Sequence, residues 1–355
     1  MSGREMRSNS WHPSGRRLDQ TPAIGYNKAA VCLFTFVIIF LPQIKQKRYI
    51  DMFGYRPDGR RITDIDPIVR ITPYLMPMRC DAQVFLQHKV DYENMARYIA
   101  AQGAKGERIT FMNIIVAAYV RAVSQHPEVN RFIMNKQYYS RNNCTVSFTM
   151  LKDPTNADAG ETGVKIRFDP TDTIYDVRDR MAKVIDSNRG EENHNFVDKL
   201  VRVLHAVPGL ATAVVALVRL LDRYGLCPGA LLDELPFHTG MYITNNASIG
   251  LHHVNHHIYN FGNTSLFFGM GTVERSVTMD PKNGAKLKRW LPIGITADER
   301  VCSGAHYAGF FATMREGLSH PELLEVPPET VKYDPKAEYH EPKPAKEAKA
   351  EQATA

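Results

Sequence analysis

Strand-like and helix-like hydrophobic patterns alternate along residues 60–325, and this alternation constrains the fold more than any other feature of the chain. In residues 144–150, apolar side chains occupy every second position, which is the period of a β-strand. Phe111–Gln125 is apolar almost all round and stops before a His-Pro pair, so we expect a buried central helix there. Because strand and helix patterns follow one another, we predict a layered α/β fold.

The same two periods predict the other elements of this region. Residues 164–168 alternate like a second strand, while 265–272 and 291–295 are apolar runs typical of buried strands. Helical spacing of apolar residues returns in 174–185 and again in 306–318. The chain of 355 residues with 44% hydrophobic content is long enough to bury a large core.

Charge and cysteine usage exclude several classes of protein. The net charge of +6 is spread along the chain without a dense basic block, which argues against nucleic-acid binding. There is no glycine-rich dinucleotide motif and no Walker loop. The five cysteines are scattered and odd in number, so we expect free thiols in a reducing compartment and a cytoplasmic location. They are Cys32, Cys80, Cys144, Cys227 and Cys302.

Both ends of the chain differ from its centre. We expect residues 1–51 to be a poorly structured extension that carries a short apolar segment, 29–41. As a helix this segment would span about 20 Å, against about 30 Å of bilayer hydrocarbon. Three alternatives stay open: a translation start at Met52, a signal or membrane anchor, and a packed arm. Residues 332–355 are rich in Lys, Glu, Ala and Pro, which predicts a disordered tail.

Residues 196–235 form a distinct insert. Apolar stretches on either side of Pro208 and Gly209 predict two helices joined at that turn. The insert is too short and too broken to span a membrane. It is either a cap over the core or a contact for a membrane surface or an acyl chain, because each of these would bury one apolar face.

Four segments, in order, resemble the catalytic domain of the dihydrolipoyl acyltransferases of 2-oxo acid dehydrogenase complexes. They are residues 68–91, 109–133, 241–250 (MYITNNASIG) and 297–311 (ADERVCSGAHYAGFF). The resemblance implies a chloramphenicol-acetyltransferase-like two-layer sandwich with a mixed sheet over about 60–325. It also implies a homotrimer with active sites between subunits, and CoA or acyl-CoA as a substrate with no permanently bound cofactor.

Acyl transfer in that family uses a histidine as general base and a hydroxyl that stabilises the oxyanion. Matched residue by residue, the hydroxyl falls on Thr244 and the base falls on Glu299. The supporting Asp or Asn of the family falls on Ser303, and its motif glycine on Gly304. The donor type is therefore kept, whereas the base has changed from histidine to glutamate.

An ordinary glutamate titrates about four units below a thiol, which makes it a weak base for a thiol proton. Burial in an apolar channel would close much of this gap. If the chain is extended here, Asp298 and Arg300 point away from Glu299, and we expect Arg70 or Arg79 either to pair with Asp298 or to line the path of CoA. The alternative is a site in which Glu299 is merely tolerated. Cys302 is interpreted as a packed thiol and not as a nucleophile.

A second candidate for the base is the sequence HHVNHH shortly after Thr244. It comprises His252, His253, His256 and His257. Three interpretations stay open: a structural or solvent-facing loop, a base or substrate contact from His256 or His257, and a metal site. The metal site lacks a convergent carboxylate or cysteine within the cluster, so we predict no metal.

These observations predict a stand-alone, CoA-dependent acyltransferase that moves an acyl group between a CoA thioester and a thiol or small-molecule acceptor. Because no lipoyl-type pattern or Pro/Ala linker precedes residue 60, we expect a free acceptor and not a tethered lipoamide. One alternative is a catalytically lapsed trimeric CoA-binding or scaffold protein. Another is a protein with weak membrane-surface contact through 29–41 or 196–235.

Overall fold

The computed structural model describes residues 55–151, 160–188, 208–280 and 284–334. The apolar segment 29–41, residues 196–207 of the predicted insert and residues 335–355 lie outside the described residues. Residues 332–334 still belong to the folded body, because the Lys332 backbone N–H donates to Ser124 O at 2.8 Å and Asp334 accepts from Arg131 at 2.5 and 2.7 Å.

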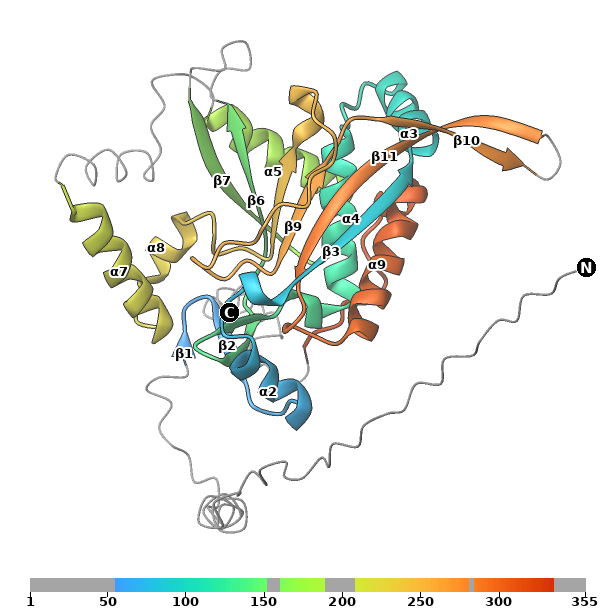
Figure 1. Cartoon of the computed structure of the whole chain (residues 1–355). Coiled ribbons are helices and arrows are strands. Elements are labelled where there is room, and N and C mark those ends of the chain that lie inside the picture. The colour runs from blue at the N-terminus through green and yellow to red at the C-terminus, as the bar shows by residue number, and fades with distance from the viewer. Residues whose placement is uncertain (1–54, 152–159, 189–207, 281–283, 335–355) are drawn as a thin grey trace, which may run out of the picture. The chain divides into compact units, whose positions relative to one another are not determined.

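A seven-stranded mixed sheet forms the centre of the molecule (Figure 1). Its strands are β3 (Gln83–Asp91), β6 (Cys144–Leu151), β7 (Glu161–Phe168), β8 (Met241–Asn245), β9 (Leu266–Met270), β10 (Glu274–Asp280) and β11 (Gly284–Asp298). The order runs β10-β11-β9-β8-β6-β7, and β3 pairs with β11. β8 is parallel to both β6 and β9, while the other pairs are antiparallel.

Helices cover one face of this sheet and bury the main core. They are α3 (Tyr92–Ala104), α4 (Phe111–Gln125), α5 (Ile174–Ser187) and α9 (Gly304–Ser319). Figure 1 shows α4 and α9 side by side behind the long strands. α4 begins with a capping box, in which Thr110 Oγ1 accepts from Asn113 N at 3.2 Å and Asn113 Oδ1 accepts from Thr110 N at 2.9 Å. Burial of α4 on nearly all sides follows from its uniformly apolar sequence.

A small antiparallel sheet lies at one end of the large one. It contains β1 (Tyr55–Arg56), β2 (Gly59–Ile62), β5 (Gln137–Arg141) and β4 (Phe132–Met134). α2 (Pro67–Leu75) packs on it, and Tyr138 donates to Val69 O at 2.8 Å. The two-residue turn from β4 to β5 places Asn135 and Lys136 at φ values of 49° and 61°.

The sequence patterns predicted these elements well. The strands expected at 144–150 and 164–168 are β6 and β7, which pair antiparallel, and the buried runs 265–272 and 291–295 supply β9 and the second half of β11. The helices expected at Phe111–Gln125, 174–185 and 306–318 are α4, α5 and α9. The predicted α/β fold class with a mixed sheet is confirmed.

The described part of the insert forms α7 (Leu210–Arg223) and α8 (Gly229–Glu234). α7 starts directly after Gly209, whose φ of 81° suits glycine at the predicted turn. α7 buries its apolar residues only in part: Asp222 is its one fully buried residue, Val214, Val218 and Leu221 are half-buried, and Leu217 and Leu220 are each 53% exposed. For α7, a cap over the core and a contact for a membrane surface or an acyl chain both stay predictions.

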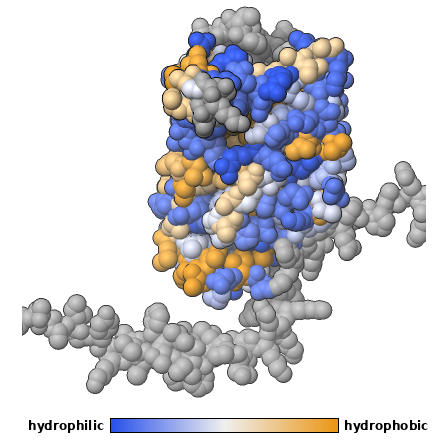
Figure 2. All heavy atoms as spheres, turned by 90° about the vertical axis from the view of Figure 1, so that its right-hand side faces the viewer, coloured by the Kyte–Doolittle hydropathy of each residue, from blue (hydrophilic) through white to orange (hydrophobic). Residues whose placement is uncertain are grey.

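Apolar side chains are also exposed at the end of the molecule where α2 lies. Ile68 and Leu75 of α2 are 78% and 72% exposed. Figure 2 shows orange side chains gathered at this lower end, while most of the remaining visible face is hydrophilic. Among the described residues, no helix has the length and apolar character needed to cross a membrane.

Candidate active site

Glu299 follows directly after the last residue of β11. Its backbone N–H donates to Ala82 O at 2.9 Å, which ties the end of β11 to the segment before β3. The Glu299 side chain is exposed and lines a cavity of about 480 Å³. The walls of this cavity, called the Glu299 cavity below, include Val84, Leu86 and Phe311. Apolar walls are present as the sequence argument requires, but the single chain does not bury the carboxylate.

Asp298 and Arg300 are buried while Glu299 is exposed, although the backbone is not extended here as expected: Glu299 and Arg300 form a turn, in which Val301 N–H donates to Asp298 O at 3.2 Å. Arg300 donates to both carboxylate oxygens of Asp298, at 2.8 and 2.7 Å, and both side chains are buried. Arg79 Nε lies 3.9 Å from Asp298, so of the two arginines considered for this pairing it is Arg79 that approaches Asp298. Tyr307 donates to Asp298 O at 2.8 Å. This buried ion cluster holds the turn that presents Glu299.

In the part of the chain that the structure describes, Ser303 forms no hydrogen bond with Glu299. Its hydroxyl lies 2.7 Å from His306 Nδ1, one turn further along α9. His306 Nε2 in turn lies 3.9 Å from Glu128 Oε1. Both Ser303 and His306 are exposed. The sequence argument did not single out His306, although the spacing of three residues at a helix start would have indicated the contact.

Cys302 also lines the Glu299 cavity, as a buried thiol. Burial raises its pKa to about 12, in spite of the nearby Arg131. A thiol with so high a pKa has almost no thiolate near neutral pH. This supports a packed thiol, as the sequence predicts. Cys80, Cys144 and Cys227 are free as well.

Thr244 lies in a different cavity, of about 750 Å³. Along β8, Met241 and Ile243 face the main core, so Tyr242 and Thr244 face the opposite side of the sheet. The Thr244 side chain is partly buried, and its hydroxyl forms no hydrogen bond with a described residue. The hydroxyl is therefore available to donate to a ligand in this cavity, called the Thr244 cavity below.

The histidine loop, residues 251–259, lies on the same side of the sheet as Thr244. Glycines on β9 and β11 allow the backbone of this loop to approach the sheet closely. A Cβ at Gly269 would come within 2.4 Å of Val254 O, and one at Gly294 within 2.5 Å of the same atom. At Gly271, just after β9, a Cβ would lie 2.0 Å from His253 N. Only glycine leaves room for the loop backbone here.

His256 is the histidine that enters the Thr244 cavity. Its ring stacks on Phe267 with centroids 4.1 Å apart and an angle of 10°. Its Nδ1 lies 2.7 Å from His257 O, and a carbonyl only accepts, so Nδ1 carries the proton. Burial lowers the pKa of His256, so the neutral ring is favoured and Nε2 keeps its lone pair.

The other histidines of the loop have different surroundings. His252 Nδ1 lies 3.3 Å from Thr272 Oγ1, and His253 Nδ1 lies 3.5 Å from Glu274 on β10. His257 is exposed and stacks on His256 with centroids 4.6 Å apart. The four rings do not converge, and the described residues contain no group of His, Cys, Asp or Glu side chains that would hold a metal ion.

Within one chain, the structure brings together Thr244 and His256 and keeps Glu299 apart from them. Thr244 and His256 line one cavity, whereas Glu299 and Ser303 line another. His257 lines neither of these cavities. The two bases considered from the sequence are therefore not equivalent, because only His256 shares a cavity with the hydroxyl of its own chain.

No family model matches the chain, and no curated protein matches it in sequence. The described fold is similar to that of a probable dihydrolipoamide acetyltransferase from Listeria monocytogenes 4b F2365. That match has 11% identity and a TM-score of 0.46, over 73% of this chain and 94% of that chain. A chloramphenicol acetyltransferase is similar at 10% identity and a TM-score of 0.46, over 73% and 99% of the two chains. A truncated catalytic core of the 2-oxoacid dehydrogenase multienzyme complex from Thermoplasma acidophilum has 15% identity and a TM-score of 0.44, over 74% and 99%.

Proposed function

We propose that the protein is a CoA-dependent acyltransferase that moves an acyl group from a CoA thioester to a thiol or small-molecule acceptor. One observation carries the proposal: the unpaired hydroxyl of Thr244 and the neutral imidazole of His256 line the same cavity. Acyl transfer needs a donor for the developing oxyanion and a base with a pKa near neutral. The Thr244 hydroxyl is a donor, and burial lowers the pKa of His256, which keeps its imidazole in the basic form at neutral pH.

With a thiol acceptor, His256 Nε2 takes the proton of the thiol as its sulfur attacks the thioester carbonyl carbon. The carbonyl oxygen becomes an oxyanion, to which the Thr244 hydroxyl donates a hydrogen bond. Collapse of the tetrahedral intermediate breaks the bond to the CoA sulfur. The proton on Nε2 then passes to the leaving thiolate, so the imidazole returns to its neutral form.

Glu299 supplies a second route to the same reaction. In a homotrimer with sites between subunits, Glu299 of one subunit would approach the Thr244 cavity of its neighbour. Contact with the neighbour would also bury this carboxylate, which is exposed in the single chain. Burial is the condition under which a carboxylate becomes a useful base for a thiol proton.

A catalytically lapsed CoA-binding or scaffold protein is the second candidate. The surroundings of Glu299 favour it, because Ser303 bonds to His306 and leaves the carboxylate without the polar support that the family motif provides. This candidate predicts binding of CoA without turnover. The acyltransferase predicts release of the CoA thiol.

The test measures thiol release from a panel of acyl-CoA esters with several thiol acceptors. We expect His256→Ala to lower kcat/KM by about 10²–10⁴-fold, the usual contribution of a general base. Thr244→Val, which keeps the shape and removes the hydroxyl, should cost about 10²–10³-fold. His257→Ala is the matched control, because this neighbouring histidine stacks on His256 but does not line the cavity.

Full activity in His256→Ala, together with a large loss of activity in Glu299→Gln, would identify Glu299 as the base and support the route between subunits. Binding of CoA without thiol release from any ester would support the scaffold and refute the acyltransferase. Equal losses in His256→Ala and His257→Ala would show that the loop acts through its packing and not through one imidazole.

A further inference from the structure

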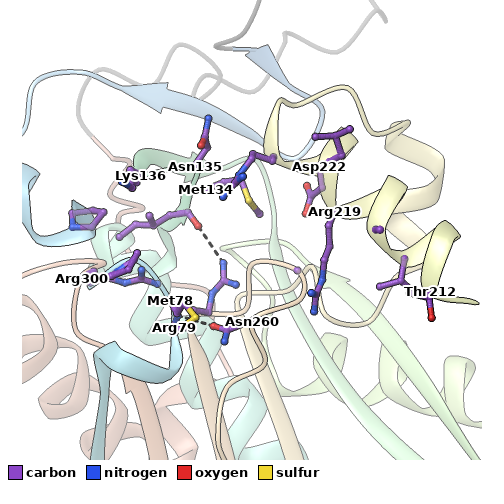
Figure 3. Close-up of a pocket in the computed structure, with 18 of the residues that line it drawn as sticks. Met78, Arg79, Met134, Asn135, Lys136, Thr212, Arg219, Asp222, Asn260 and Arg300 are labelled. Carbon is purple, nitrogen blue, oxygen red and sulfur yellow. Dashed lines mark hydrogen bonds between the residues drawn. The ribbon is translucent and has the colours of Figure 1, made fainter. Parts of the chain in front are cut away.

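A third cavity, of about 930 Å³, lies where α7 approaches the small sheet (Figure 3). Its walls come from α7, from the β4–β5 turn and from the segment that joins α2 to β3. Neither Thr244 nor Glu299 lines it. It is called the α7 cavity below, and the proposed acyl transfer makes no use of it.

Five cationic side chains line the α7 cavity, from separate parts of the chain. Arg219 and Arg223 come from one face of α7, Lys136 from the β4–β5 turn, Arg79 from the segment before β3, and Arg300 from the turn after β11. Figure 3 shows Arg79 and Arg219 on two walls of the same space. Such a convergence concentrates positive potential in a space with low-dielectric walls.

Carboxylates do not neutralise this charge. Of the described residues that line the cavity, Asp222 is the only acidic one, and Arg56 and His238 already bind its carboxylate at 2.6 and 2.8 Å. Asp298 offsets one charge of the pair Arg79 and Arg300. The remaining three cations, Lys136, Arg219 and Arg223, form no ion pair with a described residue.

Arg79 is buried, at 6% exposure, and of these five cations only Arg300 is more buried, at 3%. The Arg79 guanidinium donates to Ile133 O at 3.1 Å and to Tyr259 O at 3.5 Å, and Asp298 lies at 3.9 Å, yet burial lowers the pKa of Arg79 to about 10. A buried guanidinium with so incomplete a set of partners gains from a bound anion, because the anion restores the interactions that water would provide.

Lys136 has an unusual backbone for its residue type. Its φ of 61° lies in the left-handed region, where glycine is favoured and other residues are strained. The turn nevertheless carries a lysine, and its ammonium group lies 4.9 Å from the centre of the Tyr74 ring. The Lys136 ammonium group adds positive charge to the cavity from the β4–β5 turn.

Most of the rest of the lining is apolar, and α7 supplies part of it. Val215, Ala216 and Leu220 face the cavity from the helix, and Met78 and Ile133 face it from the other walls. A free inorganic anion would leave this surface in contact with water. An apolar chain next to a charged head would cover it and would use the exposed side of α7 that the fold leaves without a partner.

We propose that the α7 cavity binds an anionic amphiphile, with a phosphate or carboxylate head at the arginines and an apolar chain along α7. The proposal goes beyond the proposed acyl transfer, because neither Thr244, His256 nor Glu299 takes part. A phosphate head fits the number of uncompensated cations, and a carboxylate head shares the same chemistry.

The test is titration calorimetry of the full chain with monomeric dodecyl phosphate and with dodecanoate. One molecule should bind per chain. Arg219→Ala with Arg223→Ala should weaken binding by about tenfold or more, since hydrogen bonds to charged groups are the strong ones. Arg275→Ala is the control, an exposed arginine on β10 outside the cavity. Val215→Asp should weaken binding, whereas Leu217→Asp, on the same helix but outside the cavity, should leave it unchanged.

Lys136→Gly separates ligand binding from folding. Glycine relieves the strained turn, so we expect the melting temperature to rise while affinity for dodecyl phosphate falls. The relative affinities of dodecyl phosphate and dodecanoate identify the preferred head.

Three results would overturn the proposal. The first is binding of dodecyl maltoside, which has the same apolar chain and no charge, with the same affinity as dodecyl phosphate. The second is a loss of affinity in Arg275→Ala as large as the loss in the Arg219→Ala and Arg223→Ala double variant. The third is displacement of dodecyl phosphate by CoA alone, which would assign the cavity to the substrate of the proposed acyl transfer.

Discussion

At the scale of single residues, the surroundings of each ionisable group decide which role it is able to perform. His256 is partly buried, and its ring stacks on Phe267. Its Nδ1–H donates to a backbone carbonyl, so the other ring nitrogen, Nε2, acts only as an acceptor. Glu299 is exposed, and Cys302 is a buried thiol with a raised pKa. Of these three groups, only His256 combines the basic form at neutral pH with a place in the cavity of Thr244, the proposed oxyanion donor.

The first prediction concerns the pH dependence of activity. The pKa of His256 lies below the ordinary value of 6.5, because burial disfavours its charged form. The base form is present above this pKa, so kcat/KM should be constant at neutral pH and fall as the pH drops through a value below 6.5. A pH–rate profile of thiol release measures this limb. The residual activity of His256→Gln should not show this fall at acid pH. A fall that persists in this variant would contradict the assignment of His256 as the base.

The second prediction concerns the buried ion cluster at the end of β11. Asp298→Asn leaves Arg79 and Arg300 buried without a carboxylate, which should lower the free energy of unfolding by about 3–5 kcal/mol. Chemical denaturation measures the change. The control is Asp233→Asn, whose partner Arg167 is 54% exposed and which should cost less than about 1 kcal/mol. Similar losses in the two variants would show that the cluster does not hold the turn.

At the scale of elements, two local devices place the candidate sites. Glycines on β9 and β11 let the histidine loop lie directly on the sheet. A single buried carboxylate, Asp222, attaches α7 to Arg56 of the small sheet and to His238, which lies just before β8 of the large sheet. Both devices depend on small features of the sequence that no hydrophobic period reveals.

The third prediction tests the contact of the histidine loop with the sheet. Gly294→Ala would place a Cβ 2.5 Å from Val254 O, a backbone atom, so the loop must shift. We expect a loss of about 1–3 kcal/mol in stability, together with a fall in kcat/KM as His256 moves. Gly103→Ala on α3 is the control, because a Cβ meets nothing within 4 Å there and should stabilise the helix. Normal kcat/KM in Gly294→Ala would show that the loop position is irrelevant to activity.

The fourth prediction concerns α7. Burial opposes the charge on Asp222, but His238 and Arg56 outweigh it and lower its pKa to about 2. The attachment should therefore be complete above the ordinary carboxyl pKa of about 4 and weaken as the pH falls towards 2. Limited proteolysis measures the release of α7, and Asp222→Asn should be cut near α7 already at neutral pH. Glu234→Gln, an exposed neighbour on α8, should resist cleavage as the original protein does.

At the scale of the whole molecule, the separation of Thr244 from Glu299 becomes the main question. Their cavities lie apart in one chain, so these residues would cooperate only across a boundary between subunits. Heterologous contacts that close into a ring place one surface of each subunit against a different surface of the next. The trimer implied by the sequence resemblance has this arrangement.

The fifth prediction distinguishes a site within one chain from a site between chains. Thr244→Val and Glu299→Gln chains are unfolded, mixed in equal amounts and refolded together. If a site takes Thr244 and Glu299 from neighbouring subunits, roughly a quarter of the sites regain both groups and activity reappears. If His256 is the base, a Thr244→Val and His256→Ala mixture should stay inactive. Native mass spectrometry of each mixture establishes whether mixed trimers formed.

The sequence by itself determined the elements and the layers. Periods of two and of about 3.6 residues identify which side chains of β6, β7, α4 and α5 face a core, because the backbone geometry of strand and helix sets these periods. The resemblance of local segments also singled out Thr244 and Glu299, since residues close together in a motif keep their order whatever surrounds them. The sequence also offered Arg79 as a partner of Asp298, and Arg79 lies 3.9 Å from it, whereas the shorter pairing of Asp298 with Arg300 was not predicted.

Only the tertiary structure decided which of these residues meet. The period of β8 places Thr244 on one face of the sheet, but it does not say that the loop carrying His256 will cover that face, because this depends on the space above glycines 269, 271 and 294. In the same way, the apolar sequence of α7 predicts a helix that buries one face against the core, a membrane surface or an acyl chain. In the structure, Asp222 binds Arg56 and His238, while Leu217 and Leu220 stay exposed. A local sequence pattern predicts the direction of a side chain, whereas long-range packing determines which residues that side chain contacts.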